Sequence, residues 1–130
     1  MSDTFVTKNI LKWYDLNKRS LPWRKNVSKE KRQYNTLISE FMLQQTQVAT
    51  VIPYFNKFVK EIPNIKKLAS VDNKKLIKLW EGLGYYSRAR NLKKAAQSVI
   101  KNFNGVIPDN FDDLKSLSGI GDYTANAILA

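Results

Sequence analysis

Apolar residues recur at helical spacing along most of the chain, and the strict alternation that marks a β-strand is nearly absent. Residues suited to N-caps precede several of these stretches, among them Asp3, Thr46, Asn64, Asp72 and Asn110. We therefore predict an all-α protein. The predicted helices cover residues 4–17, 34–43, 46–62, 64–69, 72–80, 87–103, 110–117 and 122–130.

One acidic residue, Glu40, interrupts the second of these patterns. At about 100° per residue it lies roughly 60° from both Leu37 and Leu43, on the flank of an apolar face. A partly desolvated carboxyl has a raised pKa and can donate a proton at neutral pH. This segment alone leaves a second interpretation open, in which Glu40 sits at the edge of an amphipathic helix and reaches water or a neighbouring side chain.

Two turns carry candidate nucleic-acid contacts. The amide and hydroxyl side chains of Gln44-Gln45-Thr46 can hydrogen-bond base edges and wedge into a duplex, although such residues are also common in ordinary loops. Between the last two predicted helices, Gly119-Ile120-Gly121 allows backbone N–H groups to approach a phosphate at a helix N-terminus. The alternative is a tight turn that needs glycine for its backbone alone.

Composition sets the remaining bounds. The 130 residues are 43% hydrophobic, which suffices for one domain with a core, and the net charge of +11 indicates a polyanionic partner. Lysine-rich composition could also produce that charge. Residues 19–32 nevertheless place six basic residues around Leu21-Pro22-Trp23, as nucleic-acid contacts require. No cysteine and no long apolar run occur, so we predict no cysteine-ligated metal or cluster on these residues, no membrane span, and a cytoplasmic location.

Five motifs together resemble the adenine DNA glycosylase (MutY) family, which belongs to the helix-hairpin-helix superfamily shared with endonuclease III. The resemblance covers nearly the whole chain and implies the six-helix-barrel glycosylase fold. The motifs are Leu21-Pro22-Trp23-Arg24, Ser39-Glu40 through Gln47-Val48, Val51-Ile52-Pro53-Tyr54-Phe55, Gly82-Leu83-Gly84-Tyr85-Tyr86-Ser87-Arg88-Ala89-Arg90-Asn91, and Gly119-Ile120-Gly121.

The resemblance implies removal of adenine mispaired with 8-oxoguanine or guanine in double-stranded DNA, by hydrolysis of the N-glycosidic bond. Glu40 matches the acid that protonates adenine, and Tyr123 matches a tyrosine of the catalytic pocket. Tyr123 stands where glycosylase/lyases have the lysine that forms a Schiff base, which favours a water-using enzyme. The other matched positions are Arg19, Trp23, Arg24 and Leu43 in the adenine pocket, Gln45 and Tyr85 in the wedge, Thr46 and Leu83 beside the lesion guanine, and Gly119, Ile120 and Gly121 in the phosphate-binding hairpin.

The resemblance also implies parts that these 130 residues do not supply. In the family, a second catalytic carboxylate, the cysteines of a [4Fe-4S] cluster and a lesion-reading domain lie downstream of the hairpin. We therefore expect a truncated monomer. Residues 1–20 are the N-terminal helix that in the family packs on a C-terminal lobe absent from this chain, and residues 21–130 form an incomplete barrel domain with its hairpin at 111–130. The isolated chain is expected to be inactive. A related mismatch glycosylase acting on another base, such as thymine, and a non-catalytic DNA-binding hairpin module stay open as alternatives.

Overall fold

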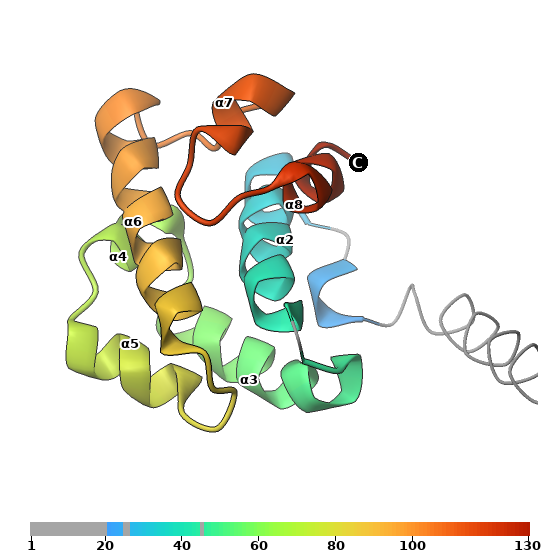
Figure 1. The fold of residues 1–130 in the computed structure, drawn as a ribbon, viewed down its shortest axis with the longest axis vertical. Coiled ribbons are helices and arrows are strands. Elements are labelled where there is room, and N and C mark those ends of the chain that lie inside the picture. Colours follow the sequence, from blue (N-terminus) through green and yellow to red (C-terminus); the bar gives the residue numbers. More distant parts are fainter. Residues whose placement is uncertain (1–20, 25–26, 45) are drawn as a thin grey trace, which may run out of the picture.

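The computed structural model describes residues 21–24, 27–44 and 46–130, and these residues form helices with no strand. The all-α prediction is therefore confirmed for the described part of the chain (Figure 1). The helix predicted over residues 4–17 lies outside the described residues. The elements are η2 (Pro22–Arg24), α2 (Lys29–Leu43), α3 (Val48–Glu61), α4 (Ile65–Ala69), α5 (Asn73–Trp80), α6 (Tyr86–Asn102), α7 (Phe111–Lys115) and α8 (Asp122–Leu129).

Helix α2 is the centre of the fold, because it contacts η2, α3, α6 and α8 (Figure 1). Its apolar side chains Leu37, Ile38 and Phe41 are completely buried. Near its start, the Tyr34 hydroxyl donates a 2.5 Å hydrogen bond to the carbonyl of Ile62, which follows α3. Burial raises the pKa of Tyr34 well above its ordinary value, so this hydroxyl stays protonated and keeps donating.

The other helices complete a core around α2. Helix α4 packs mainly on α6, α5 contacts both α3 and α6, and α7 contacts α8. Trp80 at the end of α5 is fully buried and meets Phe58 of α3 edge to face, with ring centroids 6.1 Å apart. None of the described helices is long and apolar enough to cross a membrane.

Three of the predicted N-caps are confirmed. Asn64, Asp72 and Asn110 each accept a hydrogen bond from a backbone N–H in the first turn of the helix that follows, at 2.9, 2.7 and 2.9 Å. These bonds satisfy donors that a helix start otherwise leaves unpaired. These polar N-cap residues thus determine where α4, α5 and α7 begin.

Three predicted helix starts are wrong. Helix α2 begins at Lys29 and not at Tyr34, because Ser28 caps it by accepting from the Lys31 N–H at 3.2 Å. Helix α3 begins at Val48 after Gln47, so Thr46 does not cap it. Helix α6 begins one residue before Ser87, at Tyr86.

Candidate active site and nucleic-acid interface

Glu40 lies in the last turn of α2 and is half-buried, between Ser39 and Phe41, which are both completely buried. A half-buried carboxylate is what the flank of an apolar helix face predicts. Glu40 also has an interaction within the protein. Its position gives a carboxyl group that is partly shielded from water yet still reachable from outside.

The turn between α7 and α8 packs directly on this part of α2. Gly119 has a φ of +80°, and a Cβ added there would lie 2.9 Å from the Phe41 ring and 3.1 Å from the Asn91 side chain. Ser118 donates a hydrogen bond from Oγ to Oδ1 of Asn91 at 3.1 Å. Only glycine fits this conformation and this space together. The hairpin is thus seated against the residue next to Glu40.

In the rest of the hairpin, one side chain is anchored in the core and the N-cap of α8 faces open space. The Ile120 side chain is buried, whereas a Cβ on Gly121, the N-cap of α8, would meet nothing within 4 Å. Tyr123, in the first turn of α8, is 80% exposed. The hairpin therefore presents backbone and the tyrosine side chain outwards, on a helix N-terminus that carries a partial positive charge.

Arg88 of α6 holds the end of α2, and its side chain is buried. Its Nη1 donates to the carbonyls of Phe41 at 3.0 Å and Met42 at 3.1 Å, and also to the carbonyl of Gln44. Its Nη2 lies 3.4 Å from the Thr46 hydroxyl, which accepts from it. Thr46 therefore serves as a partner of Arg88 and not as the helix cap that the sequence predicts.

A second turn, Leu83–Tyr85, precedes α6. Leu83 is buried, so in this structure its side chain anchors the turn, and its role beside the lesion guanine stays a prediction. Tyr85 is 59% exposed and has left-handed backbone angles, φ 51° and ψ 58°. A bulky residue rarely adopts this region, and such strain is concentrated at functional sites.

Only some of the residues assigned to the adenine pocket and the wedge have side chains that the structure describes. Trp23 is buried and packs edge to face on Phe55, with ring centroids 5.2 Å apart, and Leu43 is half-buried. Arg19, the side chain of Arg24, and the wedge residue Gln45 lie outside the described residues. The roles of all these residues stay predictions.

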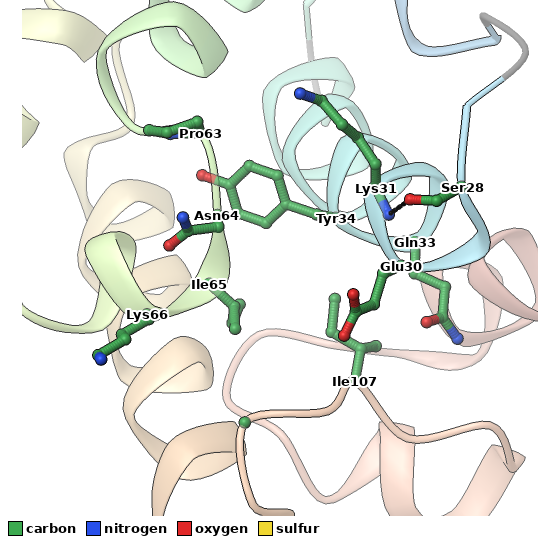
Figure 2. A pocket seen from close by; sticks show the side chains of 11 residues that line it. Ser28, Glu30, Lys31, Gln33, Tyr34, Pro63, Asn64, Ile65, Lys66 and Ile107 are labelled. Carbon is green, nitrogen blue, oxygen red and sulfur yellow. Dashed lines mark hydrogen bonds between the residues drawn. The ribbon is translucent and has the colours of Figure 1, made fainter.

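A cavity elsewhere in the described chain does not coincide with this site. A cavity of about 380 Å³ lies at the start of α2, between that helix and the segments around Asn64 and Ile107 (Figure 2). Glu30, Lys31 and Tyr34 extend from α2 toward it. Glu30 and Glu40 are separated by roughly 15 Å along the helix, at about 1.5 Å per residue. The cavity therefore does not belong to the predicted catalytic site.

Sequence reasoning missed the structural role of Arg88, although it lies within one of the matched motifs. Its position could have indicated burial, because Arg88, Leu92 and Ala96 share one face of α6 and the other two are apolar. A cation on an apolar helix face usually has a specific set of acceptors. Among the described residues, no group of three or more acidic, histidine or cysteine side chains could hold a metal ion.

The comparisons with known proteins agree with this geometry. The family described as the HhH-GPD superfamily base excision DNA repair protein matches residues 38–128. Adenine DNA glycosylase of Rattus norvegicus is 45% identical over 96% of this chain and 25% of its own length. The Buchnera aphidicola (Baizongia pistaciae) enzyme of the same name is 47% identical over 100% of this chain and 36% of its own length. The Homo sapiens enzyme is 44% identical over 92% of this chain and 23% of its own length. The chain thus spans only about a quarter to a third of these relatives.

Solved structures show the same fold. A thermostable thymine-DNA glycosylase superposes with a TM-score of 0.77 at 27% identity, covering 98% of this chain and 57% of that protein. Endonuclease III in a non-covalent DNA complex gives a TM-score of 0.71 at 22% identity, with 94% and 57% coverage.

Proposed function

The chain belongs to the HhH-GPD superfamily of base excision DNA repair proteins, and we propose that its protein removes adenine from duplex DNA in which that base is mispaired with 8-oxoguanine or guanine. The observation that carries the proposal is the packing of Gly119 on Phe41, which brings a phosphate-binding hairpin to the neighbour of a half-buried carboxylate. The names of the 44–47% identical relatives support adenine as the base.

In this mechanism Glu40 works first as an acid and then as a base. The target nucleotide leaves the helix stack, because its C1′–N9 bond is out of reach inside the duplex. As that bond breaks, its electron pair goes to adenine, and adenine takes a proton from the Glu40 carboxyl. Water then adds to C1′ and returns a proton to Glu40. The first step needs the protonated carboxyl, and the second needs the carboxylate that the first step leaves.

The hairpin keeps the sugar-phosphate backbone in place during these steps. Backbone N–H groups around Gly119 and Gly121, with the N-terminus of α8, can hold one phosphate. Because Gly119 is pressed against Phe41, that phosphate would be fixed relative to Glu40. Surface lysines add affinity that does not depend on sequence, since the net charge is +11.

Tyr123 favours hydrolysis over lyase chemistry. A Schiff base with the opened sugar requires an amine, and a phenol cannot form one. Tyr123 is exposed at the start of α8, where a DNA backbone bound by the hairpin would pass. We propose that this side chain contacts the sugar-phosphate of the target nucleotide and that water is the nucleophile.

The [4Fe-4S] cluster expected for the family does not fit the residues present. Such clusters are held by cysteine thiolates, and this sequence has no cysteine. No step of the mechanism depends on the cluster.

The proposal is tested with the protein expressed from its intact gene, under single-turnover conditions. Duplexes carrying 8-oxoguanine·adenine, guanine·adenine, guanine·thymine and a matched pair are compared, and the released base is identified by mass. We expect adenine from the first two duplexes only. Release of thymine would instead support the related mismatch glycosylase, an alternative that the 27% identity to a thymine-DNA glycosylase keeps open. Tight binding with no base released would favour the non-catalytic module.

A further inference from the structure

Arg88 is a buried cation whose described partners are all neutral. It is 7% exposed, and the groups in contact with it are backbone carbonyls, one hydroxyl and two aromatic rings. Burial lowers the pKa of Arg88 from its ordinary value, which reflects the cost of desolvating the guanidinium. A neutral side chain of similar volume would often pack at such a place with less cost. Stability alone therefore does not explain why a guanidinium group occupies this buried position.

The end of α2 offsets part of that cost. The last carbonyls of a helix lack intrahelical donors and carry the negative end of the helix dipole. Arg88 donates to two of them, those of Phe41 and Met42, and to the carbonyl of Gln44 just beyond the helix. These charge-assisted bonds fix the path of the chain as it leaves α2.

The other half of the same guanidinium reaches the second turn. Its Nη2 lies 3.4 Å from the carbonyls of both Leu83 and Gly84, at the long end for a hydrogen bond. The guanidinium carbon is 5.2 Å from the centre of the Tyr85 ring and 5.8 Å from that of Trp80, within the range of cation–π attraction. Tyr85, which is strained and mostly exposed, is thus held from beneath by Arg88.

One planar side chain therefore joins two turns that are about forty residues apart in sequence. Gln44 and Thr46 flank Gln45 in the sequence, and both are bonded to Arg88. Tyr85 stacks on the same group. Gln45 and Tyr85 are the two residues that the family resemblance assigns to the wedge, and Arg88 contacts the neighbours of the first and the ring of the second.

We propose that Arg88 is the positioning residue of the base-extrusion step, a clamp that fixes Gln44 and Thr46 relative to the Leu83–Tyr85 turn. The inference rests on the proposed function and deepens it. Extrusion costs a few kcal/mol of unstacking. If the two turns could move apart, inserting them would displace the turns while the base stayed stacked in the duplex. Binding to an undistorted duplex needs no such rigidity, because phosphate contacts supply most of the binding free energy.

The clamp requires the forked shape of arginine. Lysine keeps the charge but offers a single nitrogen on a flexible stem, so it can serve the α2 carbonyls or the second turn and not both. Glutamine removes the charge and keeps only one donor nitrogen in place of three. The exposed Lys101, in the last turn of α6, provides the matched control, because Lys101→Gln removes one positive charge from the same helix without touching either turn.

The experiment compares Arg88→Gln, Arg88→Lys and Lys101→Gln with the wild-type protein expressed from its intact gene. Three quantities are measured: the rate of extrusion, from stopped-flow fluorescence of 2-aminopurine placed beside the target adenine; the affinity for undamaged duplex, from anisotropy; and amide hydrogen exchange at Thr46 and Leu83, with Leu68 of α4 as the internal reference. The exchange measurement is made without DNA, so it does not depend on activity.

We expect Arg88→Gln to slow extrusion by about tenfold or more, the equivalent of about 1.4 kcal/mol of activation free energy. Duplex affinity should stay within about twofold of Lys101→Gln, since both variants lose one charge and neither charge needs to contact DNA. Exchange at Thr46 and Leu83 should accelerate while Leu68 is unchanged. Arg88→Lys should fall between the wild type and Arg88→Gln in extrusion rate.

Wild-type extrusion together with wild-type protection of both turns in a folded Arg88→Gln protein would overturn the clamp. If Arg88→Gln does not fold, Arg88→Lys decides in the same way. If the wild-type protein extrudes and releases no base from any duplex, the proposed function fails, and the exchange measurement still decides the clamp: loss of protection at both turns supports it and unchanged protection overturns it.

Discussion

Replacing Gly119 by alanine should destabilise the protein more than the same change at Gly105 or Gly121. The φ of +80° alone costs a non-glycine residue about 1–2 kcal/mol. The new methyl group would also lie 2.9 Å from the Phe41 ring and 3.1 Å from the Asn91 side chain. Both neighbours are held, Phe41 in the core and Asn91 by Ser118, so this overpacking adds about 1–3 kcal/mol.

Two other glycines allow the cost of backbone strain to be measured separately from the cost of the steric contact. Gly105 has the same φ of +80°, but its Cβ would meet only the tip of Ile100 at an ordinary 3.5 Å. Gly105→Ala should therefore cost only the strain, about 1–2 kcal/mol. Gly121 has a φ of −96° and open space, so Gly121→Ala should cost less than about 1 kcal/mol, as a poorer N-cap.

The assay is urea unfolding of the three variants and the wild type, with the free energy of unfolding taken from each transition. The order of destabilisation should be Gly119→Ala, then Gly105→Ala, then Gly121→Ala, with about 2–5 kcal/mol for the first. If Gly119→Ala is no more destabilising than Gly105→Ala, the hairpin does not press on Phe41. The link between the phosphate site and Glu40 would then be refuted.

Two further predictions concern tyrosines. Tyr34→Phe should lower the free energy of unfolding by about 1–3 kcal/mol, because it leaves the Ile62 carbonyl without the donor that the hydroxyl supplies. Since the pKa of Tyr34 is raised in the folded state, the stabilising contribution of its hydroxyl is complete below the unfolded-state pKa of about 10 and is progressively lost as the pH rises above it. The wild type should therefore lose stability relative to Tyr34→Phe between about pH 10 and 11, and parallel pH profiles would contradict this. Because Tyr123 cannot form a Schiff base, the protein should release adenine without cutting the DNA strand, as gels run with and without alkali treatment will show; strand cleavage without alkali at the rate of base release would refute the assignment.

The parts of the fold that were predictable are those set by local chemistry. Asn64, Asp72 and Asn110 cap helices with their own side chains, a signal that needs no tertiary context. The start of α2 was misplaced because the residues from Lys29 to Arg32 are exposed and charged, so the apolar period begins only at Tyr34. A search for caps in place of apolar periodicity would have found Ser28.

The parts that were not predictable depend on residues far apart in sequence. Thr46 resembles a helix cap locally, but Arg88, forty-two residues later, takes its hydroxyl as an acceptor. The left-handed backbone of Tyr85 likewise goes against its local preference and is compensated by the Arg88 guanidinium beneath its ring. The half-burial of Glu40 followed from helix geometry alone, whereas the seating of the hairpin on Phe41 required the tertiary structure.

The central claim is that Glu40 supplies the proton that releases adenine. The most direct test is a single-turnover excision assay on the 8-oxoguanine·adenine duplex with the protein expressed from its intact gene. Glu40→Gln is compared with Glu61→Gln, which makes the same chemical change on the exposed last turn of α3. We predict that Glu40→Gln lowers the rate by about 10²–10⁴-fold, the usual contribution of general acid–base catalysis, while duplex affinity is retained and Glu61→Gln behaves as the wild type. Excision by Glu40→Gln within a few-fold of the wild-type rate would contradict the account.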